Sequence, residues 1–195
     1  MAGVVLFHSA LGLRPGVVSA ADRLRASGHE VYVPDYYDGE TFGEMDDGLG
    51  KRDALGMEEV LRRGREAVAD LPAGLVYAGF SLGAMPAELL AATRPGARAA
   101  ILMHSAIPVE EFAGFGAHGW PEGLPAQVHY ATGDPWVERE EVDGFRRDVE
   151  RAGGAFEEHT YPGSAHLFSD PDLPDYDRAS SEEMWRRVLA FLERL

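Results

Sequence analysis

The sequence predicts an α/β protein with a doubly wound, mostly parallel sheet of about six or seven strands and helices on both faces. Two observations predict this fold class. Short apolar runs alternate along the chain with longer segments whose apolar residues recur at helical spacing. The first of the short runs, residues 4–7, is apolar throughout, as expected of a parallel strand that is buried on both faces.

The first predicted elements are a strand, a helix and a second strand. Residues 4–7 form the first apolar run. Residues 15–27 carry apolar side chains at helical spacing, and Gly28 stands where glycine commonly ends a helix. Residues 31–33 form the second strand, which ends at Pro34.

A less regular segment precedes the third strand. Residues 36–56 are rich in glycine, aspartate and aromatic residues, and we expect a long surface loop or a small cap there. Residues 57–71 form a predicted helix that Pro72 stops. The third strand, residues 75–78, leads into a helix over residues 82–93.

The same alternation continues to the end of the chain. The remaining predicted strands are residues 99–103, 127–131 and 155–160, and the remaining helices are residues 138–152 and 180–195. Residues 107–125 are rich in glycine, proline and aromatic residues and belong near the rim of the sheet. Because no internal repeat or interdomain linker interrupts this pattern, we expect one domain over residues 1–195.

Composition excludes several classes of function. The formal net charge is -15, so nucleic acid and anionic membranes are not expected partners, because both repel an acidic surface. The absence of cysteine excludes disulfides, thiolate nucleophiles and cysteine-ligated metals. The apolar stretch at the N-terminus is too short for a signal peptide or a membrane span, so we expect a cytoplasmic protein.

Ser81 lies between the third strand and the next helix, in the sequence Gly79-Phe80-Ser81-Leu82-Gly83. A serine between two glycines at a sharp strand-to-helix turn is typical of a nucleophile elbow. The five-residue pattern has low specificity on its own, and Ser81 also fits a small residue in a tight turn. Its interpretation as a nucleophile requires a base and a carboxylate further along the chain.

Asp134 and His166 stand where such partners are expected. Asp134 follows the fifth predicted strand, although it also fits a turn residue in Gly-Asp-Pro, and His166 lies in the loop after the sixth strand. The order Ser81, Asp134, His166 is the order of doubly wound hydrolases. Five other histidines lack this combination of a late position and a loop after a strand: His8, His104, His118, His129 and His159.

Acyl transfer to a serine also requires donors for the oxyanion that forms on the substrate. One donor is expected to be the backbone N–H of Leu82, directly after the candidate nucleophile. The second is expected in the loop after the first strand, where we favour the backbone N–H of Ala10.

Four stretches carry a resemblance that spans nearly the whole chain: VVLFHSALGL, GFSLGA, GDPWV and YPGSAHLF. They resemble the oxyanion loop, the nucleophile turn, the acid turn and the histidine loop of the dienelactone hydrolases, a family of the α/β-hydrolase superfamily. The resemblance implies an α/β-hydrolase fold and a small ester or lactone substrate. It also implies a catalytic triad of Ser81, Asp134 and His166, with no cofactor or metal.

The chain departs from the founding members of this family at several positions. They use cysteine where this chain has Ser81, and a glutamate where it has Ser9. An arginine that binds a substrate carboxylate is replaced by Asp170, and their other such arginine falls near residues 62–65. Because an aspartate that faced the pocket would repel a carboxylate, we expect neutral esters or lactones to be better substrates than dienelactone.

The sequence therefore predicts a serine hydrolase that cleaves a small carboxylic ester or lactone through an acyl-serine intermediate. A thioesterase or acyl-peptide hydrolase on the same triad, and a non-catalytic binding protein with the same fold, remain as alternatives. The residues considered for substrate binding are Ser9, Leu11, His104, Trp136 and Phe168. The acidic run over residues 169–177 is interpreted as a solvated loop rather than a metal site.

Overall fold

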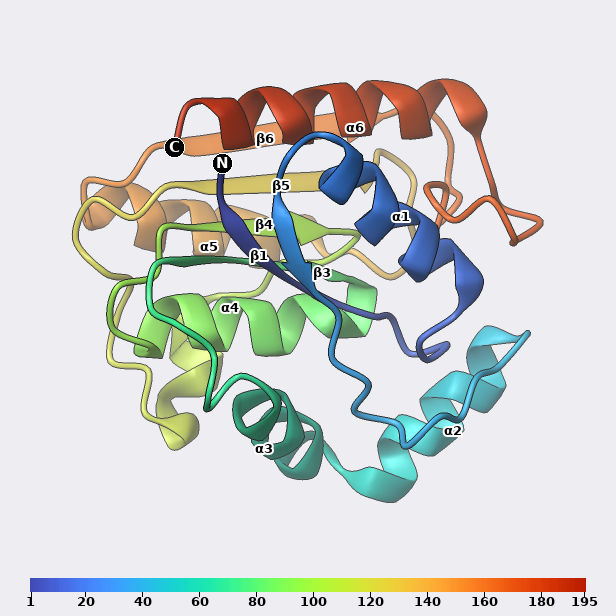
Figure 1. The fold of residues 1–195 in the computed structure, drawn as a ribbon, viewed down its shortest axis with the longest axis horizontal. Helices are drawn as coiled ribbons and strands as arrows, with labels where there is room; N and C mark the ends of the chain where they lie inside the picture. Colours follow the sequence, from blue (N-terminus) through green and yellow to red (C-terminus); the bar gives the residue numbers. More distant parts are fainter.

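The sheet has six parallel strands in the order β2-β1-β3-β4-β5-β6 in a computed structural model that describes residues 1–195. The strands are β1 (Gly3–Phe7), β2 (Glu30–Tyr32), β3 (Leu75–Phe80), β4 (Ala99–Met103), β5 (Ala126–Ala131) and β6 (Phe156–Tyr161). Helices cover both sides of this sheet (Figure 1). The predicted fold class and strand number are confirmed.

Alternation along the strands divides the buried side chains between two cores. In β1, Val4 and Leu6 belong to one core, whereas Val5 and Phe7 belong to the other. Successive side chains of a strand point to opposite faces, so a strand that is buried on both faces must be apolar at every position. The apolar runs of the sequence are therefore the direct result of this three-layer arrangement.

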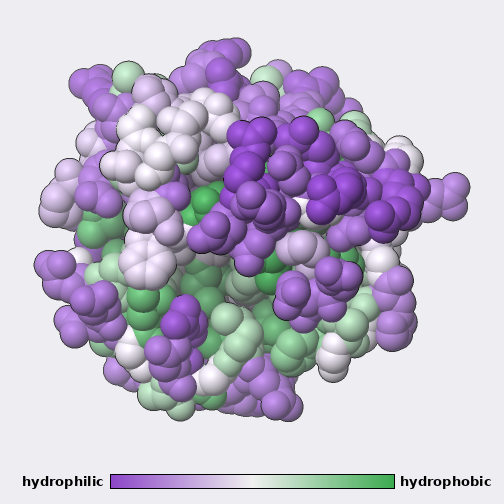
Figure 2. Space-filling model, turned by 180° about the vertical axis from the view of Figure 1, so that it is seen from behind, coloured by the Kyte–Doolittle hydropathy of each residue, from purple (hydrophilic) through white to green (hydrophobic).

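Each face of the sheet has its own set of helices. The helices α1 (Pro15–Ala26) and α6 (Arg178–Glu193) pack on one face, through apolar side chains such as Val17 and Val188. The helices α3 (Met57–Ala67), α4 (Ala84–Thr93) and α5 (Arg139–Arg151) pack on the other. Seen from behind, the molecule has hydrophilic borders around a hollow in which hydrophobic residues are exposed (Figure 2).

The segment predicted as a loop or small cap contains a helix, α2 (Met45–Leu55). Its sequence gave no strong helical signal because Gly48 and Gly50 interrupt it and few apolar residues are available. Gly48 is required where it stands, since a Cβ atom there would lie 2.3 Å from the carbonyl oxygen of Ala10. The glycine thus lets α2 approach the loop after β1 closely. A short 3-10 helix, η2 (Val109–Phe115), also lies in the segment predicted as irregular.

The order of the strands creates a crevice at the carboxyl ends of β1 and β3. The chain proceeds outward from β1 to β2, then returns across β1 to β3 and continues in the opposite direction. Loops on the two sides of such a reversal leave the sheet in opposite directions, and the crevice between them is where ligands bind in sheets of this type. His8 follows β1 and Ser81 follows β3, so both lie at this crevice.

Candidate active site

Ser81 begins the 3-10 turn η1 (Ser81–Gly83), which connects β3 to α4. Its φ angle is 52°, a left-handed conformation that few residues other than glycine adopt. The flanking glycines make the turn possible. A Cβ atom on Gly79 would lie 2.0 Å from the carbonyl oxygen of Gly83, and one on Gly83 would lie 2.4 Å from that of His8. The turn therefore closes both on itself and against the end of β1.

A chain of hydrogen bonds joins Ser81, His166 and Asp134. The Oγ atom of Ser81 lies 2.7 Å from Nε2 of His166, and Nδ1 of His166 lies 2.7 Å from Oδ2 of Asp134. The other carboxylate oxygen, Oδ1, accepts a hydrogen bond of 2.9 Å from the backbone N–H of Trp136. Asp134 and His166 are both buried. This geometry allows an imidazole to receive the serine proton while a carboxylate holds the ring in the required tautomer.

The loop after β1 offers a free backbone donor beside Ser81. Leu11 donates to Oγ of Ser9 at 3.2 Å and Gly12 donates to the carbonyl of Ser9, whereas the buried Ala10 N–H donates to no acceptor in the protein. The N–H of Leu82 lies in the first turn of η1, where helical donors lack an intrahelical acceptor. Ala10, Ser81 and Leu82 line the same pocket.

His8 shapes this loop from the inside of the protein. Its Nδ1–H donates to the carbonyl of Ser9 at 2.7 Å, and its Nε2 accepts from the backbone N–H of Tyr36 at 3.4 Å. The His8 ring stacks on the Tyr36 ring with their centroids 3.7 Å apart. Burial lowers the pKa of His8 to about 4. His8 is therefore a neutral structural residue at neutral pH.

The pocket that contains Ser81 is open to solvent, and seven of its twelve lining residues are hydrophobic. Three of its lining residues are methionines, Met45, Met57 and Met85, which supply flexible and polarizable walls. Arg52, on α2, is a cationic side chain at its border and pairs with the exposed Asp53 at 2.6 Å. The lining thus combines apolar side chains with one cationic side chain.

Two of the five predicted substrate-binding residues, His104 and Trp136, line this pocket. The other three do not line it, and their role in substrate binding stays a prediction. Ser9 turns its hydroxyl toward the Leu11 N–H, and Leu11 is buried against neighbouring loops. Phe168 is buried in the core, where its ring packs against those of His104 and Tyr161.

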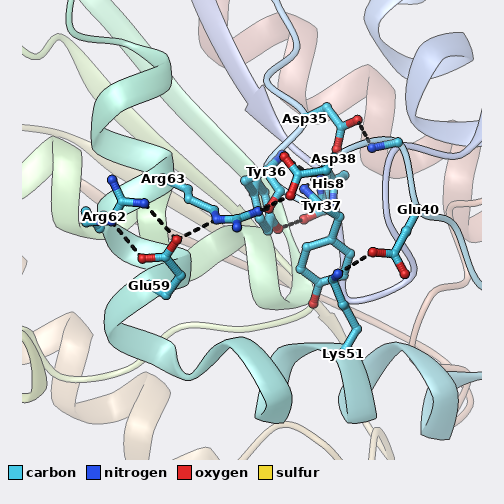
Figure 3. A network of polar contacts seen from close by, with 11 residues as sticks. His8, Asp35, Tyr36, Tyr37, Asp38, Glu40, Lys51, Glu59, Arg62 and Arg63 are labelled. Atoms are coloured by element: carbon cyan, nitrogen blue, oxygen red, sulfur yellow. Dashed lines mark hydrogen bonds and ion pairs between the residues drawn. The ribbon is translucent and has the colours of Figure 1, made fainter.

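The region in which the sequence suggested a substrate-binding arginine is engaged in ion pairs and backbone contacts. Arg62 and Arg63 both pair with Glu59, and Arg63 also pairs with Asp38 (Figure 3). Arg65 donates to the carbonyl oxygen of Phe115. None of these arginines lines the Ser81 pocket. The arginine at the pocket is Arg52, which sequence reasoning missed because it lies in the segment where no helix was predicted.

Asp170 does not face the Ser81 pocket. Its Oδ2 lies 3.6 Å from Nε of Arg14. Its Oδ1 packs so closely against α1 that a Cβ atom on Gly16 would lie 2.0 Å from it. The carboxylate is thus directed to the N-terminal turn of α1, where a negative charge is favourable. This geometry does not support repulsion of an anionic substrate by Asp170.

Two further observations concern metals and membranes. The structure brings no three histidine, aspartate or glutamate side chains together in an arrangement that could bind a metal ion. None of its helices combines the length and the apolar character needed to cross a bilayer.

Comparison with known proteins gives a consistent result. The model of the dienelactone hydrolase family matches residues 1–195. A curated relative, carboxymethylenebutenolidase from Rhodococcus opacus, is 27% identical over 209 residues, which cover 98% of this chain and 80% of the relative.

Solved structures show the same fold. A dienelactone hydrolase-like promiscuous phosphotriesterase from metagenomic libraries aligns with a TM-score of 0.80 at 20% identity, over 100% of this chain and 87% of its own. Esterase 2 from Thermogutta terrifontis, phosphonylated by cyclosarin, aligns with a TM-score of 0.64 at 17% identity, over 99% of this chain and 82% of its own.

Proposed function

Because the chain belongs to the dienelactone hydrolase family, we propose that it is a serine hydrolase that cleaves a small carboxylic ester or lactone through an acyl-serine intermediate. The observation that supports this proposal is the chain of hydrogen bonds from Ser81 through His166 to Asp134, at 2.7 Å each. It lies at the crevice of the parallel sheet, beside a free backbone N–H at Ala10.

The proposed reaction begins with attack by Ser81. Its Oγ bonds to the substrate carbonyl carbon while its proton passes to Nε2 of His166. The carbonyl oxygen becomes an oxyanion, which accepts hydrogen bonds from the N–H groups of Ala10 and Leu82. Asp134 keeps Nδ1 of His166 protonated and stabilises the imidazolium cation. The tetrahedral intermediate then collapses: the bond to the alkoxy oxygen breaks, and that oxygen takes the proton from His166.

The acyl-serine is hydrolysed by the same groups in reverse. His166 removes a proton from a water molecule as the water oxygen bonds to the acyl carbon. The second tetrahedral intermediate collapses, Ser81 Oγ leaves and recovers its proton from His166, and the carboxylic acid is released. For a lactone, the alcohol and the acid belong to one product, because the ring is opened.

The lining of the pocket favours a substrate that carries a carboxylate. Arg52 places a guanidinium in its lining, paired with the exposed Asp53, and a guanidinium attracts a carboxylate. Asp170, which the sequence suggested would face the substrate, is paired with Arg14 outside this pocket. The name of the Rhodococcus opacus relative describes an enzyme for a lactone with a carboxymethylene group, and we extend that substrate class to this chain.

The test is covalent labelling with a fluorophosphonate, together with turnover of p-nitrophenyl esters, a matched thioester and a matched amide. We expect the wild type to be labelled and to cleave esters, and Ser81→Ala to lose labelling and roughly 10⁴- to 10⁶-fold in rate. Ser164→Ala, at an exposed serine on the loop that carries His166, is the control and should be labelled normally. Near-normal turnover by Ser81→Ala would exclude the acyl-serine, and faster cleavage of the thioester or amide would change the substrate class.

A further inference from the structure

His104 combines unusual backbone geometry with a position next to the candidate triad. It directly follows β4 and has a φ angle of 67°, in the left-handed region that side chains other than glycine rarely occupy. Its side chain is fully buried. Strained positions of this kind persist where the surrounding structure over-determines them, and they concentrate at functional sites. The proposed reaction above gives His104 no role.

The contacts of His104 reach both sides of the candidate active site. The centroid of its ring lies 6.2 Å from the ring centroid of Phe80, the residue before Ser81, and 4.7 Å from that of Phe168. Its Nε2 lies 2.8 Å from Oγ of Ser169, three residues after His166. Its ring centroid is 5.9 Å from that of His166. His104 therefore contacts the strand end that carries the nucleophile and the loop that carries the base.

The position of His166 in the sheet explains why its loop needs support. Ser81 follows β3, but His166 follows β6, and β4 and β5 lie between these two strands. Neighbouring strands are about 4.8 Å apart, so the loop must reach roughly 14 Å across the strand ends to bring the imidazole to Ser81. Asp134, after β5, supports the loop at one point through Nδ1 of His166. His104, after β4, supports it at a second point, closer to Ser81.

His104 is suited to a structural hydrogen bond and unsuited to proton transfer. Burial, with smaller effects of His166 and His129, lowers its pKa well below the usual value, so the ring stays neutral. Its Nδ1 has no hydrogen-bond partner. The tautomer that leaves Nδ1 as a bare acceptor avoids a buried unpaired N–H, and in this tautomer Nε2–H donates to the Ser169 hydroxyl.

We propose that His104 is a positioning residue, whose hydrogen bond to Ser169 fixes the loop of His166 over the end of β4 and keeps the imidazole within reach of Ser81. This inference depends on the proposed function of Ser81 and His166. The bond is one of several contacts of the loop, which include a backbone hydrogen bond of 3.0 Å from Asp177 N–H to the Phe168 carbonyl. The ion pair of Asp170 with Arg14 connects the same loop to α1, whereas the bond from His104 connects it to the end of β4.

Ser169 allows a matched pair of variants. Threonine and valine have nearly the same shape, but only threonine retains the hydroxyl. Ser169 lines a solvent-open pocket between α1 and α6, so an added methyl group has space on that side. We expect Ser169→Thr to keep kcat for p-nitrophenyl acetate within about threefold of the wild type. Ser169→Val should lose about tenfold in kcat with KM changed by less than twofold, because the ester still binds but the base is displaced.

Two measurements separate positioning from simple loss of stability. The kcat values are compared at a temperature at which urea titration shows both variants to be folded. The second readout is NMR of ¹⁵N-histidine-labelled protein, in which the Nδ1–H proton of His166 should be sharp in the wild type and in Ser169→Thr. It should broaden by exchange with water in Ser169→Val.

These measurements separate a wrong role for His104 from a wrong proposed function. If the wild type turned over no ester, the acyl-serine proposal would fail, whereas the NMR comparison would still decide the role of His104. Equal kcat values for folded Ser169→Thr and Ser169→Val, or an unchanged Nδ1–H signal in Ser169→Val, would overturn the positioning role. A selective loss in Ser169→Val in both measurements would support it.

Discussion

The Asp170 carboxylate and the Arg14 guanidinium form an ion pair of 3.6 Å in which both side chains are largely buried, with 13% and 15% of their surface exposed. Arg14 also donates to the carbonyls of Phe42 and Asp172, at 2.8 and 3.1 Å. One arginine thus connects three loops that surround the N-terminus of α1. The negative charge of Asp170 is committed to this structural arrangement.

We predict that Asp170→Asn reduces stability without changing the charge preference of the enzyme. Removal of one partner from a mostly buried ion pair at a helix N-terminus should cost about 1 to 3 kcal/mol in urea unfolding. The ratio of kcat/KM for dienelactone to that for its uncharged methyl ester should change by less than about twofold, because Asp170 is directed away from the pocket. A rise of tenfold in this ratio would show that the aspartate does act on the substrate.

Replacement of Arg52, in contrast, should change the charge preference of the enzyme. Arg52→Met keeps an apolar side chain of similar length in a pocket already lined by methionines. It removes the only cation that lines this pocket, and the lost attraction to a carboxylate at about 4 Å is on the order of 1 to 4 kcal/mol. The same kcat/KM ratio should therefore fall by about fivefold or more. The fall should come from slower turnover of dienelactone, while the methyl ester is unaffected. Arg62→Met, on the exposed side of α3, is the control and should leave the ratio unchanged.

Gly83→Ala tests the contact between the nucleophile turn and the oxyanion loop. The new Cβ atom would lie 2.4 Å from the carbonyl oxygen of His8 and 2.6 Å from that of Phe7, so one of the two backbones must move. We expect a loss of about 2 kcal/mol or more in stability. We also expect kcat to fall by about 100-fold in the folded protein, since displacement of one oxyanion donor costs this much. Gly114→Ala, where nothing lies within 4 Å, should have little effect on either quantity.

Buried histidines make the protein sensitive to acid. The pKa of His8 is lowered from 6.5 to about 4 by burial, so the unfolded chain binds a proton in this range that the folded protein does not. Stability therefore rises with pH between 4 and 6.5, and acidification to pH 5 should cost roughly 2 kcal/mol from His8 alone. His104 and His129 shift in the same direction and add to the loss. Urea titrations at pH 7.5 and pH 5 measure this change, and equal stabilities at the two values would contradict it.

Buried Glu88 should make the protein less stable as the pH rises. It is fully buried on α4, where one oxygen accepts a hydrogen bond of 3.3 Å from Ile107 N–H and the other, Oε1, has no partner. Burial, with smaller effects of Asp148 and Glu141, raises its pKa well above the usual value. Its contribution to stability is present below the unfolded pKa and is lost as pH rises through the folded pKa. Glu88→Gln should therefore be more stable than the wild type at pH 8, by about 1 kcal/mol or more, and should lose this advantage at pH 4.5.

The strands could be predicted from the sequence because their signal is local. Residues 99–103 are apolar throughout, and the structure places β4 at these positions. The order of Ser81, Asp134 and His166 relative to the strands was also readable, because parallel strands bring their carboxyl ends to one edge of the sheet.

Side-chain direction and α2 could not be predicted in the same way. From its position in the sequence, Asp170 was expected to face the substrate. Its carboxylate instead pairs with Arg14, which lies more than 150 residues earlier in the chain. The helix α2 forms although it contains two glycines, and its apolar residues Met45 and Leu49 line the pocket and are only partly buried against the core. Its stability depends on contacts with the loop after β1, and the residues of α2 alone do not reveal these contacts.

The arrangement of the candidate triad over separate strands has a consequence for folding. Ser81, Asp134 and His166 follow the third, fifth and sixth strands, and parallel strands pair only after the chain has crossed over a helix. Such non-local pairings form late, because each requires a long loop to close first, whereas helices form within microseconds. On dilution from urea, ester hydrolysis should therefore return with the pairing of β6 against β5, after most of the helical circular dichroism has recovered.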